Sequence, residues 1–249
     1  MSDLKGRTAV VTGGGTGIGL ACARRLAEMG VETILMGRQL DRLGDAAKTI
    51  AGARAIRCDV TDEDSVAEAF AAAGAIDILV NNAGIAAAAA FHKTPMADWQ
   101  KIQAVNVDGL VRCSQAVIGP MLTADYARII NIASIAGLRG GAYVAPYTAS
   151  KHAVVGLTKS LSLEYARTRL TVNAVCPGYV ETQIVENAIA NIMAKTGRSR
   201  DEAIAELAKT NPQGKLIQAE EVAEAVAWLC SPLSGSVSGQ AITISGGAI

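Results

Sequence analysis

The chain has 249 residues, half of them apolar, and its 23 basic residues balance its 23 acidic ones. A formal charge of zero gives no electrostatic basis for binding nucleic acid or an anionic membrane surface. No apolar run approaches the ~18 residues of a membrane span, and residues 1–7 contain no signal-peptide core, so we expect a cytoplasmic protein.

The first predicted unit is a strand, a glycine-rich turn and a helix. Residues 8–12 form a short β-branched run that is typical of a buried strand. The run leads into Gly13-Gly14-Gly15-Thr16-Gly17-Ile18-Gly19, after which apolar residues recur at helical spacing as far as Met29-Gly30. This order points backbone N–H groups at a pyrophosphate, so we predict a dinucleotide-binding turn. The spacing is not G-x-G-x-x-G, and an ordinary glycine turn is the alternative.

Strand and helix patterns alternate along the rest of the chain. Further strands are predicted at 33–36, 53–58, 76–80, 128–133, 170–175 and 241–244, and helices at 41–50, 64–73, 98–122, 147–167 and 219–231. Several strands are near-continuous apolar runs, as parallel strands covered on both faces are. The pattern predicts an α/β fold with one Rossmann-like, doubly wound parallel sheet of about seven strands and helices on both faces. Because no linker or repeat interrupts it, residues 1–249 are predicted to form a single domain.

A tyrosine and a lysine four residues apart open the helix predicted at 147–167. Residues at i and i+4 lie on one helix face, about 5–6 Å apart at Cβ, so the Lys151 ammonium lies beside the Tyr147 phenol. A fixed cation lowers a phenol's pKa from roughly 10 toward the range of a useful proton donor. Ser134, reached from another element, is able to hydrogen-bond the same substrate oxygen. The alternative is a half-buried tyrosine beside a solvated lysine.

The ordered set of motifs resembles the short-chain dehydrogenase/reductase family. The set comprises Thr12-Gly13-x-x-x-Gly17-x-Gly19, Asn81-Asn82-Ala83-Gly84, Ser134, Tyr147-x-x-x-Lys151 and Pro177-Gly178. The motifs occur in the family's order and at its intervals, and the resemblance covers the whole chain. It implies an NAD(P)-dependent oxidoreductase that transfers a hydride between a nicotinamide and a ketone or secondary alcohol.

The resemblance implies catalytic roles for four side chains. Tyr147 protonates the carbonyl oxygen, Ser134 orients and polarises the carbonyl, and both contact the substrate. Lys151 lowers the pKa of Tyr147 and holds the nicotinamide ribose. Asn106 is a polar residue in an apolar stretch of the helix predicted at 98–122. In the family this asparagine kinks the helix and binds a water that relays protons to the lysine; a satisfied core amide is the alternative.

Turns at the carboxyl ends of the predicted strands supply the cofactor site, because ligands of doubly wound sheets bind there. Asp59 and Val60 follow the third strand, a position that contacts adenine in the family. Asn82-Ala83-Gly84 follows the fourth strand, and its small residues let the cofactor approach closely. The segment 177–182 resembles the one that holds the nicotinamide carboxamide, through the Val180 backbone and the Thr182 hydroxyl. Ordinary turn chemistry is the alternative for each loop.

The end of the second strand predicts which nicotinamide cofactor binds. Enzymes selective for NAD place an acidic residue there for the ribose 2′-hydroxyl, whereas this chain has Leu35-Met36-Gly37-Arg38. Because a guanidinium binds a 2′-phosphate at two points, NADP(H) is favoured. NAD(H) stays open, since an Arg38 stacked on adenine would admit both. The predicted cofactor residues are Gly13, Gly15, Thr16, Gly17, Ile18, Gly19, Arg38, Asp59, Val60, Asn82, Ala83, Gly84, Tyr147, Lys151, Pro177, Gly178, Val180 and Thr182.

Residues 183–216 form a predicted insert over the substrate. Apolar residues at helical spacing indicate an amphipathic lid, with plain core packing as the alternative. Its Lys195, Arg198 and Arg200 would attract a CoA or phosphopantetheine phosphate unless they form a solvated helix face. The stretches 145–156 and 173–182 resemble bacterial ketoreductases of β-keto acyl or polyketide thioesters. We therefore expect a carbonyl or alcohol substrate and favour a 3-oxoacyl thioester of CoA or a carrier protein. Because secondary-alcohol and 3-hydroxyacyl-CoA dehydrogenases are also related, reduction and oxidation both remain open as the physiological direction.

The helix predicted at 147–167 also bears on assembly. Its apolar residues lie nearly all round, at Ala149, Ala153, Val154, Val155, Leu157, Leu161 and Leu163. A helix that is apolar on every side is buried on every side, yet a helix on a sheet hides only one face. A second subunit would cover the rest. The resemblance implies a homotetramer, with a dimer as the alternative.

Cysteine and histidine usage bears on location and metals. The five cysteines are scattered, odd in number and without a C-x-x-C pair, as reduced cytosolic thiols are. His92 and His152 belong to no ligand-like cluster, so we expect no metal site.

A dinucleotide-binding sensor without turnover is the competing class of protein, and the complete set of four catalytic side chains argues against it.

Overall fold

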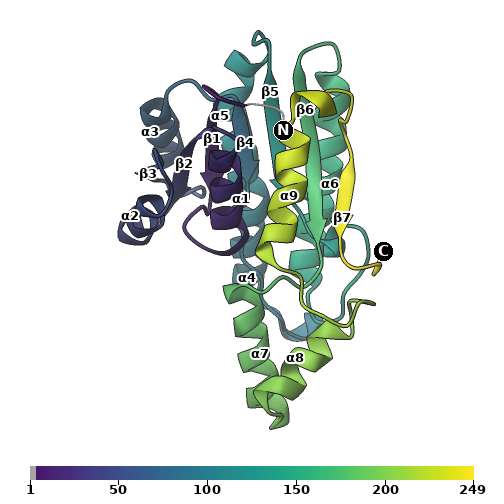
Figure 1. Cartoon of the computed structure of the whole chain (residues 1–249). Helices are drawn as coiled ribbons and strands as arrows, with labels where there is room; N and C mark the ends of the chain where they lie inside the picture. The colour runs from purple at the N-terminus through teal and green to yellow at the C-terminus, as the bar shows by residue number, and fades with distance from the viewer. Residues whose placement is uncertain (1–3) are drawn as a thin grey trace.

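The computed structural model describes residues 4–249, so residues 1–3 of the N-terminal segment considered above lie outside the described residues. Within residues 4–249, seven parallel strands form one sheet in the order β3-β2-β1-β4-β5-β6-β7 (Figure 1). The strands are β1 (Thr8–Thr12), β2 (Glu32–Gly37), β3 (Arg54–Arg57), β4 (Ile78–Asn81), β5 (Ala127–Ile132), β6 (Leu170–Pro177) and β7 (Ala241–Ile244). The predicted doubly wound parallel sheet is confirmed.

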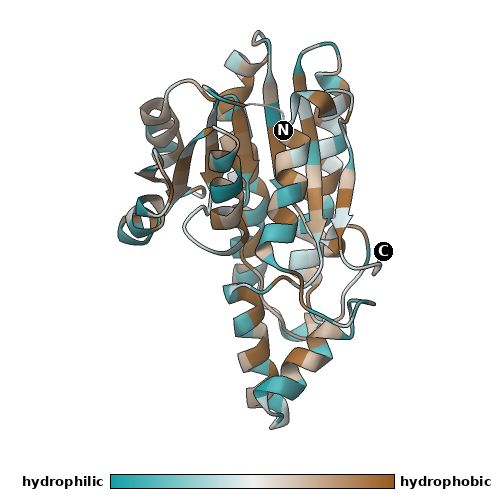
Figure 2. Ribbon diagram, viewed as in Figure 1, coloured by the Kyte–Doolittle hydropathy of each residue, from teal (hydrophilic) through white to brown (hydrophobic). Residues whose placement is uncertain are grey.

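Helices cover both faces of the sheet, because successive strand residues point to opposite sides. Helices α1 (Gly17–Glu28), α2 (Leu40–Lys48) and α9 (Ala219–Cys230) share a buried apolar cluster with Val11 and Leu35. Helices α3 (Glu63–Ala73) and α5 (Gly109–Met121) pack against Val10 and Ile34 on the other face, where α6 (Ala145–Glu164) also lies. Figure 2 shows the apolar colouring concentrated on the strands between these helix layers.

The helix predicted at 98–122 is helical as far as Met121 in the structure, but it contains a π-helical turn that the apolar periodicity did not predict. Helix α4 (Met96–Gln103) and α5 are joined by a π-helical turn, η2 (Ala104–Asp108). Asn106 lies in this turn, and its side chain bonds the backbone of Ile85, outside the helix. Such π-turns are typically single wide turns within a helix and are frequent at functional sites. The family resemblance, rather than the apolar periodicity, indicated the irregularity.

The insert at 183–216 contains two helices, α7 (Gln183–Thr196) and α8 (Arg200–Ala208), which project beyond the carboxyl ends of the strands (Figure 1). Its apolar residues are partly buried and partly exposed. Val185 and Ile189 are buried against Ala203 and Leu207 in a small cluster of their own. On α7, Ile184 and Met193 remain 46% and 37% exposed.

A short backbone bridge closes the neck of this insert. The N–H of Glu181 donates to the carbonyl of Ile217, and the N–H of Ile217 donates to the carbonyl of Tyr179, both at 2.9 Å. The two chain segments that enter and leave the helical pair are therefore held side by side.

Two other kinds of feature concern residues 4–249: a membrane-spanning helix and a metal centre. In this part of the chain, no helix combines the length and apolarity that a membrane crossing requires. The same residues contain no group of three or more His, Cys, Asp or Glu side chains placed to hold a metal ion.

Candidate active site

The predicted site residues meet at one edge of the sheet. Ser134 and the predicted cofactor loops follow β1, β2, β3, β4, β5 and β6, which all run in the same direction, while Asn106 lies in η2 and Tyr147 and Lys151 lie on α6. Strands β1 and β4 are neighbours although β2 and β3 separate them in the sequence. This change of winding direction is the switch point at which doubly wound sheets bind ligands.

The glycine turn between β1 and α1 forms a cradle that side chains would fill. Gly13 and Gly17 have φ values of +64° and +52°, a region that favours glycine. A Cβ at Gly19 would overlap the Gly13 carbonyl oxygen and the Asn82 amide nitrogen. A Cβ at Gly17 would lie 3.1 Å from Cγ2 of Thr182, so the turn also approaches the loop after β6. The bare backbone at the helix start fits a dinucleotide phosphate.

Thr12 joins this turn to the loop after β4, a role that the sequence analysis missed. Its hydroxyl accepts hydrogen bonds from the backbone N–H groups of Asn82 and Ala83, both at 3.0 Å. In return, the Asn82 side-chain amide donates to the carbonyls of Thr12 and Gly13 at 3.0 and 3.2 Å. The two predicted cofactor loops are thus held as one unit. The threonine preceding Gly13 was the available signal.

Ser134, Tyr147 and Lys151 converge beside β5 and β6. Ser134 caps the short helix η3 (Ile135–Gly137): its hydroxyl accepts from the N–H of Ala136 at 3.1 Å, donates to the Pro177 carbonyl at 3.4 Å, and lies near enough to the Tyr147 phenol to lower its pKa. Helix α6 carries Tyr147 and Lys151 on one face. The Lys151 ammonium lies 5.7 Å from the centre of the Tyr147 ring and donates to the Ile132 carbonyl at 2.7 Å.

The electrostatics of this pair differ from the expectation that Lys151 lowers the pKa of Tyr147. Burial raises the Tyr147 pKa above its ordinary value and outweighs the lowering effect of the Ser134 hydrogen bond. Burial also lowers the pKa of Lys151 to about 8. Both shifts have one cause, since a low-dielectric surrounding disfavours the charged form of either group.

Two further side chains adjoin Tyr147 and were not among the predicted site residues. Tyr179 and Cys176 both contribute to the raised pKa of Tyr147. The Cys176 thiol is fully buried, its pKa is raised to about 11 by that burial, and it lies in hydrogen-bond contact with the backbone of Ser134. The signal in the sequence was their position on either side of Pro177-Gly178.

Asn106 fixes the loop after β4 by hydrogen bonds to the backbone of Ile85. Its side-chain oxygen accepts from the N–H of Ile85 at 2.8 Å, and its amide donates to the Ile85 carbonyl at 2.9 Å. The amide also donates to the Ser150 hydroxyl at 3.0 Å. Asn106 thereby connects Gly84-Ile85 to α6 next to Lys151. Its water-relay role stays a prediction.

The remaining cofactor loops also lie at this edge. The Asp59 carboxylate accepts from the N–H and hydroxyl of Thr61 at 3.0 and 2.7 Å, and these bonds lower its pKa. Val60 is buried against Gly109 of α5. The bridge to Ile217 uses the groups flanking Val180, so the N–H and C=O of Val180 itself face the opposite side of the segment, as in any parallel pairing.

The charged residues divide between the two ends of the site. Arg38 is exposed just beyond β2, close enough to Asp59 to lower the pKa of that carboxyl. On the insert, Arg198 pairs with Glu206 at 3.3 Å and Arg200 with Glu186 at 2.9 Å. Because these two arginines already have carboxylate partners, the solvated-face interpretation holds better for them than phosphate attraction.

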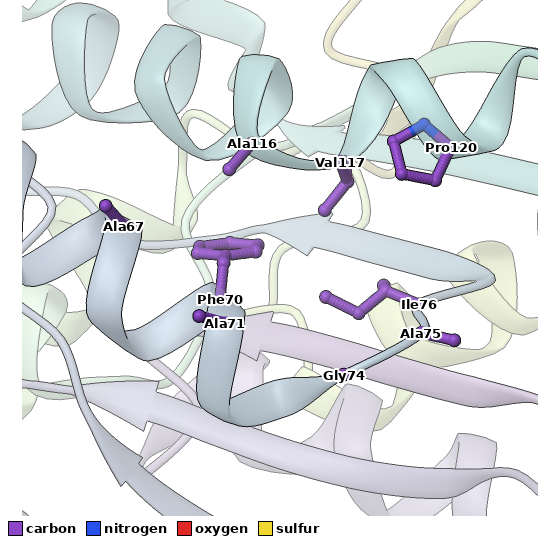
Figure 3. Close-up of a pocket in the computed structure, with 9 residues that line it drawn as sticks. All are labelled: Ala67, Phe70, Ala71, Gly74, Ala75, Ile76, Ala116, Val117 and Pro120. Atoms are coloured by element: carbon purple, nitrogen blue, oxygen red, sulfur yellow. The ribbon is translucent and has the colours of Figure 1, made fainter.

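Two cavities lie away from the candidate site. One, of about 330 Å³, is lined by apolar side chains of α3, α5 and the segment before β4, among them Phe70, Val117 and Pro120 (Figure 3). It lies toward the amino ends of the strands, opposite the candidate site. The second, of about 510 Å³, lies between α8 and residues 214–218 at the neck of the insert.

Comparisons with known proteins agree with this geometry. A family model described as short chain dehydrogenase matches residues 7–193. A Streptomyces violaceoruber protein, named as ketoacyl reductase 1 of the granaticin polyketide synthase, is 39% identical over 249 residues, covering 96% of this chain and 92% of that protein. D-beta-hydroxybutyrate dehydrogenase of Rhizobium meliloti is 34% identical over 252 residues, covering 97% and 98%. The crystal structure of a variant of actinorhodin polyketide ketoreductase with NADPH has a TM-score of 0.94 at 37% identity, covering 100% and 99%.

Proposed function

The chain belongs to the short-chain dehydrogenase family of oxidoreductases, and from this membership we propose that it reduces a β-keto group with NADP(H). The observation that carries the proposal is the meeting of Ser134, Tyr147 and Lys151 at the edge where the glycine cradle lies. A sensor that only binds a dinucleotide has no need of this hydroxyl–phenol–ammonium group.

In the proposed mechanism, the bound nicotinamide supplies the hydride. The Tyr147 phenol donates its proton to the carbonyl oxygen of the substrate, and the Ser134 hydroxyl donates a hydrogen bond to the same oxygen. The resulting phenolate is stabilised by the Lys151 ammonium on the same helix face. Asn106 keeps the loop at Gly84-Ile85 and the helix at Ser150 in place, and so positions Lys151.

The pKa of Tyr147 favours reduction at neutral pH. Reduction requires the protonated phenol, whereas oxidation of an alcohol requires the phenolate. Because burial raises the Tyr147 pKa, the phenol carries its proton throughout the neutral range. The relative named as a D-beta-hydroxybutyrate dehydrogenase supports the reverse reaction as the second candidate, and oxidation by this site would require alkaline pH.

Arg38 supports the choice of NADP(H). It follows β2, whose last residues, Leu35-Met36-Gly37, include no acidic side chain of the kind that binds a ribose 2′-hydroxyl. The NADPH in the similar ketoreductase structure supports the same choice. The remaining cofactor contacts that we propose are the glycine turn, Asp59 and Val60, the loop at 82–84, and Val180 and Thr182.

The insert supports an acyl substrate. We propose that α7 and α8 form a lid whose exposed Ile184 and Met193 contact the substrate chain. The name of the granaticin relative, a ketoacyl reductase, supports a 3-oxoacyl thioester carried on CoA or a carrier protein.

A substrate panel tests this function. Oxidation of NADPH is followed with acetoacetyl-CoA, a small β-keto ester and a simple ketone, and each is repeated with NADH. We expect turnover with NADPH, with acetoacetyl-CoA giving a higher kcat/KM than the simple ketone. A protein that binds NADPH but consumes none with any of these would be a sensor, and a clear preference for NADH would overturn the cofactor assignment.

We also propose a homotetramer in the cytoplasm. On α6, Leu163 is 79% exposed, and Ala153 and Gly156 are exposed two to three turns earlier in the same helix, so part of this apolar helix lacks a partner within the described chain. Trp228 and Leu233, which are 50% and 92% exposed, provide a second apolar area.

All five cysteines, which lie within residues 4–249, are free and buried, as in reduced cytosolic proteins.

A further inference from the structure

Arg42 lies against the glycine turn although it follows the second strand by five residues. It belongs to the first turn of α2. The Cγ and Cδ atoms of its side chain lie 3.6 and 3.8 Å from the point that a Cβ at Gly15 would occupy. The aliphatic stem of Arg42 therefore passes across the face that Gly15 leaves bare.

Small residues make this close approach possible. Leu43 is buried between the turn and the second strand: its side chain lies 3.3 Å from the Cβ position of Gly15 and 3.6 Å from that of Gly37. A larger residue at Gly15 would press on this leucine and on the neighbouring Arg42. The start of α2 is thus seated on the phosphate turn, with Arg42 next to the place where the adenosine half of a dinucleotide binds.

The charges around this place distinguish Arg42 from its neighbours. Arg38 and Arg57 both lie near enough to Asp59 to lower the pKa of that carboxyl, so part of their charge is offset. Arg42 is exposed and has no part in the Asp59 shift; like Arg38 and Arg57, it takes part in none of the ion pairs within residues 4–249. An arginine anchored by its stem and without a carboxylate partner is suited to a phosphate, which it binds through two parallel N–H groups.

We propose that Arg42 is a second residue that determines cofactor specificity, and that it binds the ribose 2′-phosphate of NADP(H) together with Arg38. This inference rests on the proposed use of NADP(H) and extends it. Two guanidinium groups, one from the end of β2 and one from α2, would then hold the phosphomonoester from two sides. NAD(H), which lacks this group, would gain nothing from Arg42.

The test measures binding of two cofactor fragments and needs no turnover. Titration calorimetry with 2′,5′-ADP and with 5′-ADP is carried out on the wild type, Arg38→Gln, Arg42→Gln and Arg167→Gln. Arg167 is an exposed arginine just beyond the end of α6 and serves as the matched control. Since a charge-assisted phosphate contact is at stake, Arg42→Gln should weaken 2′,5′-ADP binding about ten- to hundredfold and leave 5′-ADP binding unchanged.

The possible results separate the two proposals. If the wild type prefers 2′,5′-ADP and Arg42→Gln keeps that preference in full, the Arg42 inference is wrong while the use of NADP(H) stands. If the wild type binds both fragments equally, the NADP(H) proposal fails and the role of Arg42 falls with it. Equal weakening of both fragments by Arg42→Gln would also overturn the inference, since it would indicate damage to the glycine turn.

Discussion

At the scale of single residues, burial sets the chemistry of the candidate site. Tyr147 and Lys151 share one desolvated surrounding, which raises the pKa of the phenol and lowers that of the ammonium. The spacing of the two residues indicated that they lie side by side. It gave no access to the surrounding dielectric, which comes from β5, β6 and the loop at 176–179, so the spacing alone did not predict that burial raises the pKa of Tyr147.

The Lys151 shift predicts a pH-dependent stability. Its pKa is about 8 in the folded chain, against 10.5 for an ordinary lysine. Below pH 8 both states carry the proton, and burial of the charge lowers the stability of the folded protein. Between pH 8 and 10.5 only the unfolded chain binds the proton, so stability rises with pH.

Replacement by methionine removes this dependence. Relative to Lys151→Met, the wild type should gain about 2–3 kcal/mol of unfolding free energy between pH 7 and pH 10. Urea unfolding at a series of pH values measures the difference. Parallel pH curves for the two proteins would show that Lys151 keeps an ordinary pKa in the folded state.

At the scale of elements, loops at the ends of the strands carry the site and the helices hold them. Strand positions followed from the apolar runs, and the structure moves them by only a few residues. The apolar pattern did not predict the turn η2, whose Asn106 accepts a hydrogen bond from the N–H of Ile85, a residue 21 positions away. The role of Thr12 was not predicted either, because the residues that its hydroxyl bonds, Asn82 and Ala83, follow a different strand.

Loss of the Asn106 side chain should affect both stability and catalysis. Asn106→Ala leaves the N–H and C=O of Ile85 without their partners, which should lower the unfolding free energy by about 2–4 kcal/mol. Because the loop beside Lys151 is then less well held, kcat should also fall. Asn187→Ala is the control: Asn187 is exposed on α7, and its loss should change stability by less than about 0.5 kcal/mol. Similar unfolding midpoints for both variants would contradict this role.

Two glycine substitutions should distinguish an effect on dinucleotide binding by the glycine turn from an effect on the stability of the fold. Gly19→Ala would place a methyl group against the Gly13 carbonyl, so the turn must shift and dinucleotide affinity should fall at least about tenfold. Gly44 lies inside α2 with no heavy atom within 4 Å of its Cβ position, so Gly44→Ala should keep the affinity and add about 0.5–1 kcal/mol of stability. Fluorescence titration with NADPH measures the affinity of both variants and of the wild type. An unchanged affinity in Gly19→Ala would rule out a close contact between the glycine turn and the phosphate.

At the scale of the whole molecule, the parallel sheet carries the candidate site at one edge, and the insert projects beyond that edge. The doubly wound parallel sheet followed from the alternation of strands and helices, whereas the order of its strands comes from the structure. The insert was predicted as one amphipathic helix region, yet it contains two helices with a separate apolar cluster and a bridged neck. Periodicity alone does not show which apolar face meets its own neighbour and which stays exposed.

Assembly is testable at the exposed face of α6. Light scattering after size-exclusion chromatography should give the mass of a tetramer for the wild type. Leu163→Lys introduces a charge at a side chain that is 79% exposed in the single chain, so it should dissociate the assembly without unfolding the subunit. A wild-type monomer, or a variant that assembles as the wild type does, would contradict the use of this face.

The most direct test concerns the Tyr147 hydroxyl. Tyr147→Phe is compared with Tyr165→Phe, a change at the far end of the same helix. With acetoacetyl-CoA and NADPH, loss of the proton donor should lower kcat of Tyr147→Phe by about 10²-fold or more, while NADPH affinity and the rate of the Tyr165→Phe control stay close to wild type. A Tyr147→Phe protein with wild-type kcat would contradict the assignment of this phenol as the acid of the reaction.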